Sequence, residues 1–432
     1  MAATTGRAGG DDWATGFEQA KAVMDAKAKP VGSLGALESL ACRLAAAQRS
    51  VTPHVGRAAL LVFAADHGVA AARPAVSAFP AAVSAPVFRA VVRGQAASAV
   101  LCGANGVSDL IAVDVGLAAD VTDAVPPPPP PPAAGAGAGG SGGLRISVLH
   151  RKVRPDGSRS MLAGPAMSEE ELAAAMAAGA EAVRGAVRGI LPPAVVAPPP
   201  APTAVAEASE GEAGLPEDWR QCVICLGEVG IGNTTAAAAL LAALTGAAPE
   251  EVCGRGTGVD DAGLDAKRRA VADALAVNAE LIKGGGGSGG GGALAALRAV
   301  GGLELAAMAG AALEAAALGV PVVADGFISG AACLAALAHD PQRVGRVLLL
   351  SHRSAERGAA LLVSALTGAT PLAPHLLQQN PQQQQVTWPA PAVLDMGLRL
   401  GEGTGAVLVL PLLRSAAAVL RDMASLEAVL AG

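Results

Sequence analysis

A carboxylate stands between glycines in the segment L-R-L-G-E-G-T-G-A at residues 398–406. The glycines beside Glu402 leave room for a bound molecule, and the apolar stretch at 407–418 is typical of a helix that begins here. A helix N-terminus stabilises a negatively charged side chain. Glu402 is therefore a candidate site residue, although acidic residues in the first turn of a helix are also common without a role in function.

A second candidate segment, G-E-V-G-I-G-N-T-T at residues 227–235, follows an apolar run at 223–226 and precedes a helix-like stretch at 234–245. Three glycines let the backbone approach a ligand closely, and the free N–H groups at the start of a helix suit a phosphate. The lysine of the Walker pattern is absent. Taken alone, the segment fits a phosphate site and a tight turn equally well.

Two further segments contain residues that could take part in chemistry. In C-G-R-G-T-G-V-D-D at 253–261, alternate glycines expose backbone amides, and Lys267 could add a positive charge for a phosphate. The alternative is a loop followed by a helix with an exposed lysine. In A-D-H-G-V at 65–69, His67 is a candidate base, but a lone histidine after a strand is more often structural.

The elements that would position these segments are short apolar runs at 60–64, 110–113, 223–226, 320–323 and 347–350. Each ends in polar or glycine residues, and several precede alanine-rich, helix-like stretches. Apolar strands that alternate with helices indicate a parallel sheet covered on both faces. Ligands of such sheets bind beyond the carboxyl ends of the strands, where the candidate segments stand.

Composition excludes several classes of function. Aromatic residues make up 2 % of the 432 residues, the net charge is −6, and no block of Lys or Arg stands out, so we expect no nucleic-acid partner. The apolar runs are short or interrupted, so we expect no membrane span. Cys222 and Cys225 form C-x-x-C inside an apolar run and are interpreted as buried thiols, which suit a reducing compartment such as the cytoplasm, although organelle targeting is not excluded.

Low-complexity segments interrupt the chain at 126–143, 192–214, 284–292 and 378–385. They are rich in Pro, Gly, Ala or Gln and have too few large apolar side chains to offset the entropy of ordering, so we interpret them as solvated loops. They fall between the candidate segments and leave those segments intact.

Together and in this order, the segments resemble the nicotinate-nucleotide–dimethylbenzimidazole phosphoribosyltransferase family. The resemblance extends to K-P at 29–30, V-G-G-L-E at 300–304, D-G-F-I at 325–328 and S-H-R-S-A-E at 351–356. It covers nearly the whole chain outside the low-complexity loops. The segment G-Q-A-A-S at 94–98 departs from the form common in relatives.

The resemblance implies an α/β fold with a parallel six-stranded sheet flanked by helices in a large domain, residues 61–394. It implies a smaller helical domain built from residues 13–60 and 395–432, and a homodimer. The implied reaction transfers the phosphoribosyl group of nicotinate mononucleotide to 5,6-dimethylbenzimidazole, in the synthesis or remodelling of the lower ligand of cobamides. No cofactor and no metal are expected.

The resemblance also implies roles for individual residues. Glu402 is the catalytic base, and Glu228 is a carboxylate that eases positive charge on the ribose. The substrate-binding residues expected at the phosphate and ribose, with Glu228, are Gly230, Asn233, Gly256, Lys267 and Ser351. Those expected around the benzimidazole are Ser77, Phe79 and Leu400, with Gly403 also assigned to substrate binding.

Two alternatives stay open. An enzyme of the same class could prefer another acceptor, such as a different benzimidazole, a purine or a phenol, and the pocket residues near Ser77, Phe79 and Leu400 would decide this. A protein that binds a benzimidazole riboside without catalysis would belong to another class. We would expect such a protein to lack the glutamate at position 402, which this chain retains.

Overall fold

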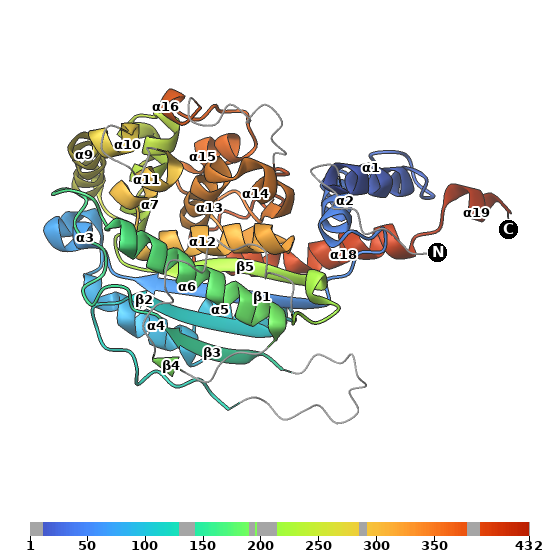
Figure 1. Ribbon diagram of the computed structural model, residues 1–432, viewed down its shortest axis with the longest axis horizontal. Helices are drawn as coiled ribbons and strands as arrows, with labels where there is room; N and C mark the ends of the chain where they lie inside the picture. Colours follow the sequence, from blue (N-terminus) through green and yellow to red (C-terminus); the bar gives the residue numbers. More distant parts are fainter. Residues whose placement is uncertain are drawn as a thin grey trace.

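The computed structural model describes residues 12–128, 143–189, 195–196, 214–284, 292–377 and 389–431. Most of the four segments interpreted as low-complexity loops lies outside these residues. The described residues form one parallel sheet with helices on both faces, which confirms the predicted fold class (Figure 1).

The sheet has the strand order β4-β3-β2-β1-β5-β6-β7, and every neighbouring pair is parallel. Six of its strands have three or more residues, and the two-residue β4 adds a seventh at the edge. Strand β3 was not predicted from the sequence. The strands are β1 (Arg57–Ala65), β2 (Asp109–Gly116), β3 (Arg145–His150), β4 (Val195–Val196), β5 (Cys222–Val229), β6 (Val322–Ala324) and β7 (Leu348–Leu350).

Two apolar cores cover the sheet because alternate side chains of each strand point to opposite faces. In β1, Leu61 and Phe63 belong to one core, whereas Leu60 and Val62 belong to the other. The first core includes α6 (Glu169–Arg188), α7 (Asn233–Thr245), α9 (Asp261–Val277), α12 (Leu303–Leu318) and α13 (Phe327–His339). The second includes α4 (Ser84–Val92), α5 (Ala97–Ala104), α17 (Thr404–Leu408) and α18 (Leu410–Asp422).

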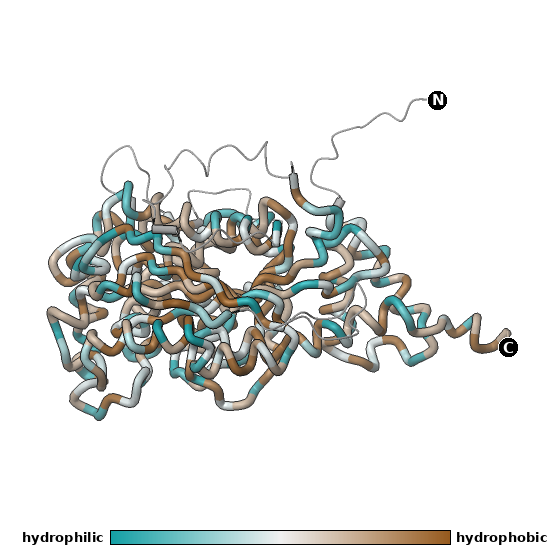
Figure 2. Tube along the Cα trace, turned by 90° about the horizontal axis from the view of Figure 1, so that it is seen from below, coloured by the Kyte–Doolittle hydropathy of each residue, from teal (hydrophilic) through white to brown (hydrophobic). Residues whose placement is uncertain are grey.

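Segments from both ends of the sequence lie side by side. Helices α1 (Asp12–Asp25) and α2 (Ala36–Gln48) pack with α18 (Figure 1). Lys27 forms an isolated antiparallel bridge with Ser425, and its ammonium donates to the carbonyl of Met423 at 2.6 Å. Helix α19 (Leu426–Ala431) projects from the body and is largely apolar (Figures 1 and 2). The boundaries assigned to the two domains stay a prediction.

One apolar stretch of the described chain, Thr404–Asp422, reaches the length and composition that a membrane crossing requires. In this fold 56 % of it is buried, and its apolar residues belong to the core shared by α2 and the sheet. Core helices commonly have this character. The stretch predicted as one helix at 407–418 is two helices, α17 and α18, which meet at Val409.

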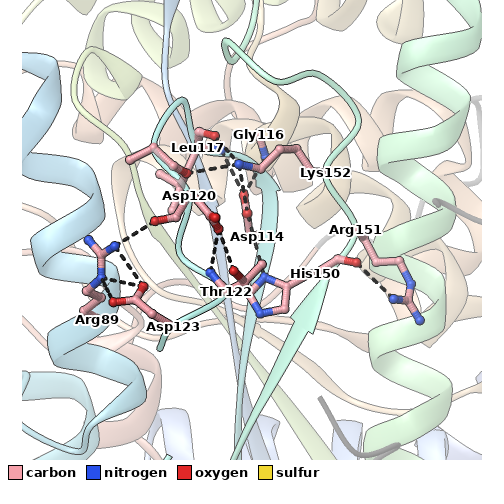
Figure 3. A network of polar contacts seen from close by, with 11 residues as sticks. Arg89, Asp114, Gly116, Leu117, Asp120, Thr122, Asp123, His150, Arg151 and Lys152 are labelled. Atoms are coloured by element: carbon pink, nitrogen blue, oxygen red, sulfur yellow. Dashed lines mark hydrogen bonds and ion pairs between the residues drawn. The ribbon is translucent and has the colours of Figure 1, made fainter. Parts of the chain in front are cut away.

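The loop after β2 is fixed at the carboxyl edge of the sheet (Figure 3). Asp114 Oδ1 accepts hydrogen bonds from the amides of Gly116 at 3.1 Å and Leu117 at 2.9 Å. The ammonium of Lys152, which follows β3, donates to the carbonyls of Leu117 at 2.7 Å and Ala119 at 3.0 Å. These contacts hold the ends of β2 and β3 together on one side of the sheet.

The cysteines are buried, as the sequence predicts. All six have free thiols, and Cys222 and Cys225 lie inside β5. Burial raises the pKa of Cys222 to about 12. Within the described residues, no three His, Cys, Asp or Glu side chains gather as a metal ion would require.

Helices α6 and α12 touch through glycine. A Cβ atom at Gly179 would overlap the carbonyl of Ala307, and one at Gly310 would overlap the backbone of Met176. The two backbones therefore approach more closely than they could if either glycine had a side chain. This contact determines how closely α6 and α12 pack over β1 and β2.

We predict that Gly310→Ala lowers the free energy of unfolding by about 1–3 kcal/mol, because the added methyl group forces α6 and α12 apart. Gly103→Ala is the matched control: Gly103 also lies in a helix, α5, but nothing lies within 4 Å of the added atom. That variant should be neutral or slightly more stable, since alanine is the better helix former. Urea unfolding of both variants checks this, and equal midpoints would contradict it.

Candidate active site

A cavity of about 550 Å³ opens at the carboxyl ends of β5, β6 and β7. This is the edge at which parallel sheets bind their ligands. Seven of the residues predicted for the site line it: Phe79, Glu228, Gly230, Asn233, Gly256, Leu400 and Glu402.

Lys267 lies one residue behind the cavity wall. Its side chain is 1 % exposed, and its ammonium donates to the hydroxyl of Thr234 at 2.9 Å. Thr234 itself lines the cavity. Burial lowers the pKa of Lys267, while the carboxylate of Glu356 acts in the opposite direction. The ammonium of Lys267 is therefore separated from the cavity by Thr234, which belongs to the first turn of α7.

The other three predicted residues also act from behind the wall. The hydroxyl of Ser77 lies 3.4 Å from that of Thr257, which lines the cavity. Ser351 is fully buried and donates to the backbone carbonyl of Asp325. Gly403 donates its amide to the carboxylate of Asp325 at 3.1 Å. The sequence analysis predicted these three positions but assigned no site role to Asp325, which contacts both Ser351 and Gly403.

Asp325 follows β6 directly and holds the start of α17. Its Oδ1 accepts hydrogen bonds from the amides of Gly405 at 2.6 Å and Ala406 at 3.2 Å, and its Oδ2 accepts the bond from Gly403. Burial raises the pKa of Asp325 to about 7, although the three amides lower it. One buried carboxyl group thus satisfies three otherwise free N–H groups of a helix N-terminus.

Glu402 belongs to the loop that Asp325 holds. Its φ of 60° is in the left-handed region, between Gly401 at 93° and Gly403 at 81°. Such a conformation costs a non-glycine residue about 1–3 kcal/mol and persists where the surroundings impose it. A Cβ atom at Gly227 of β5 would lie 2.5 Å from the carbonyl carbon of Glu402, so the loop rests directly on the strand.

Glu228 is buried at the end of β5, and Asn233 donates its side-chain amide to Glu228 Oε2. Burial raises the pKa of Glu228 well above its usual value, and the carboxylates of Glu304, Asp325 and Glu402 add to the effect. These surroundings favour the neutral acid over the carboxylate. The neutral form would act as a hydrogen-bond donor, whereas the resemblance implies a carboxylate, and the role of Glu228 stays a prediction.

His67 lies beneath the turn after β5, outside the cavity wall. Its Nε2 is 2.7 Å from Glu304 Oε1, and both side chains are almost fully buried. Burial lowers the pKa of His67, but the carboxylate of Glu304 outweighs it, and the net pKa lies above the ordinary value. A Cβ atom at Gly232 would lie 3.1 Å from the Cβ of His67. The structure therefore favours the structural interpretation of this histidine.

The other residues that line the cavity determine its charge and its shape. Among the described residues that line the cavity, Arg399 is the one Arg or Lys, and its guanidinium reaches the carbonyl of Gly256 at 3.4 Å. Helix α7 begins after Gly232, and the first two of its residues, Asn233 and Thr234, also line the cavity. Phe79 and Leu400 add apolar surface and are 52 % and 58 % exposed. The cavity therefore combines a guanidinium, apolar side chains and the carboxyl group of Glu402 in its wall.

Comparisons with known proteins agree with the sequence resemblance. The profile of a phosphoribosyltransferase family, DBI_PRT, matches residues 14–191, 215–378 and 386–429. The nicotinate-nucleotide–dimethylbenzimidazole phosphoribosyltransferase of Chromobacterium violaceum is 42 % identical over 400 residues, which are 92 % of this chain and 91 % of that protein. The enzyme of the same name from Thermus thermophilus is 38 % identical, and the alignment covers 94 % of this chain and 95 % of that enzyme.

Solved structures give the same result. The crystal structure of CobT from Thermus thermophilus superposes with a TM-score of 0.68 at 37 % identity, covering 96 % of this chain and 98 % of that one. The identity and the coverage extend across both cores and the cavity. The chain belongs to the nicotinate-nucleotide–dimethylbenzimidazole phosphoribosyltransferase family.

Proposed function

We propose that this protein transfers the phosphoribosyl group of nicotinate mononucleotide to 5,6-dimethylbenzimidazole, giving α-ribazole 5′-phosphate and nicotinate for the lower ligand of cobamides. The observation that carries the proposal is the placement of Glu402, a carboxyl group held in a strained loop in the wall of a cavity that Arg399, Phe79 and Leu400 also line. The names of the relatives support the same reaction.

The 5′-phosphate fits the end formed by the first turn of α7. Gly230, Thr234 and Gly256 line the cavity there, and Lys267 adds charge through Thr234. Arg399 lies beside Gly256 and can turn from that carbonyl to the phosphate. Asn233 and Glu228 then face the ribose, where the neutral form of the Glu228 carboxyl group can donate to a hydroxyl.

The acceptor fits the apolar side chains of the cavity wall. A dimethylbenzimidazole is flat and apolar except for its two ring nitrogens, so Phe79 and Leu400 can cover its methyl-bearing edge. Ser77 supports this region through Thr257. An acceptor that lies there directs its nitrogens toward Glu402 and the ribose.

The reaction then proceeds by displacement at C1′. One ring nitrogen of the acceptor forms a bond to C1′ as the bond to nicotinate breaks, and the leaving pyridinium takes the bonding electron pair and becomes neutral. The second ring nitrogen loses its proton to Glu402. General-base catalysis of this kind contributes about 10²–10⁴-fold, and holding the reactants in line contributes more.

We also propose that the protein is a homodimer that works in the cytoplasm. The exposed side chains of α19 support the first part, since Leu426, Val429 and Leu430 are 51 %, 56 % and 78 % exposed. A second copy could cover this apolar helix. Sedimentation should give twice the chain mass of 42.0 kDa, whereas a single-chain mass at micromolar concentration would contradict the dimer.

The six free thiols support the location of the protein in a reducing compartment such as the cytoplasm.

We predict that Glu402→Ala lowers kcat by about 10²–10⁴-fold, with little change in KM for nicotinate mononucleotide, because the proton acceptor is lost and the phosphate end is intact. Release of nicotinate and formation of the α-riboside phosphate are measured together. Glu427→Ala is the control, because Glu427 lies on exposed α19, outside the cavity. An inactive wild type that still binds dimethylbenzimidazole would favour the binding-protein alternative.

We predict that Glu228→Gln retains activity within about ten-fold of wild type, whereas Glu228→Ala loses about 100-fold. Glutamine preserves the shape and neutral charge of the protonated acid, while alanine leaves Asn233 without its partner. Steady-state kinetics at pH 7 compares the two. If glutamine is as damaging as alanine, the site needs the negative charge, and the role implied by the resemblance is supported.

A further inference from the structure

The carboxylate of Glu402 is held by a residue far away in the sequence. The hydroxyl of Ser98 donates to Glu402 Oε2 at 3.0 Å across 304 positions of the chain. Ser98 is fully buried and lies in the first turn of α5, which packs against α17. The hydroxyl therefore comes from a rigid, covered element, because no solvent reaches it.

Backbone contacts alone do not determine the orientation of the Glu402 carboxyl group. Asp325 and β5 fix the backbone around Glu402, but three side-chain torsions still separate that backbone from the carboxylate. Suppressing free rotation about such torsions costs side-chain entropy, and a reacting group must be placed within a fraction of an ångström. A fixed donor at one carboxylate oxygen removes this freedom.

The two oxygens of Glu402 are placed differently. Oε2 is bound to Ser98, and among the described residues no hydrogen bond to Oε1 is formed. Because Glu402 lines the cavity, Oε1 is the oxygen available to an acceptor N–H. When Oε1 takes the proton, Oε2 becomes the carbonyl oxygen of the acid and still accepts from Ser98, so the bond persists through the transfer.

We propose that Ser98 is a positioning residue that aims Oε1 of Glu402 at the acceptor. The inference rests on the proposed function, in which Glu402 is the base. It gives a role to the segment at 94–98, where the sequence departs from the form common in relatives.

The test uses the full chain with nicotinate mononucleotide and dimethylbenzimidazole. Ser98→Ala should lower kcat roughly ten-fold without changing KM for nicotinate mononucleotide, since hydrogen bonds to charged groups are worth a factor of this order. Ser98→Thr, which keeps the hydroxyl, should recover most of kcat.

A double-mutant cycle separates positioning from a general structural effect. In the Glu402→Ala background, Ser98→Ala should cost no further activity, because the group on which Ser98 acts is already gone. Ser364→Ala is the matched control, because this helical serine bonds Thr370 at 2.7 Å, away from the cavity. Its loss should leave kcat and the KM for nicotinate mononucleotide unchanged.

The outcomes are distinct. A Ser98→Ala variant with the kcat of wild type overturns the inference, as does an equal further loss in the Glu402→Ala background. Thermal melting of every variant shows whether a lost activity reflects unfolding. An inactive wild type rejects the proposed function itself, and the role of Ser98 with it.

Discussion

The catalytic loop depends on one buried carboxyl group. Asp325 accepts three backbone N–H bonds from the segment that contains Glu402, and it stands directly after β6. The sheet thereby fixes the loop, the loop fixes the start of α17, and α17 leads into α18. A left-handed glutamate would relax into another conformation without such constraint. The packing of the core thus determines where the side chain of Glu402 lies.

Acidic groups are concentrated around the cavity, yet the bound nucleotide is itself anionic. Glu228, Asp325 and Glu402 line it, and Glu304 lies behind. Burial resolves this conflict by raising the pKa of Glu228 well above its usual value and that of Asp325 to about 7. A raised pKa favours the neutral form of each acid, and a neutral acid repels an anionic phosphate less than a carboxylate does. The same groups can still donate or accept hydrogen bonds.

The sequence predicts much of this arrangement because the carboxyl ends of parallel strands meet at one edge. Glu228, Asn233 and Gly256 could be placed together by that rule, and the glycines around Glu402 indicated a special backbone. Contacts between distant positions could not be predicted. The bond from Ser98 to Glu402 joins an alanine-rich stretch to a motif, and the raised pKa of Glu228 depends in part on carboxylates from three other segments. Strand β3 was missed because low-complexity sequence precedes it.

The pairing of α1 and α2 with α18 has a consequence for biosynthesis. The contact between Lys27 and Met423 spans 396 positions, so α1 and α2 leave the ribosome long before α18, the helix against which they pack. The faces that they turn toward α18 are uncovered during that interval. Contacts of such long range form slowly, and transiently exposed apolar surface favours association with other chains. A nascent chain of this protein is therefore a natural client for chaperones that shield α1 and α2 until α18 has been made.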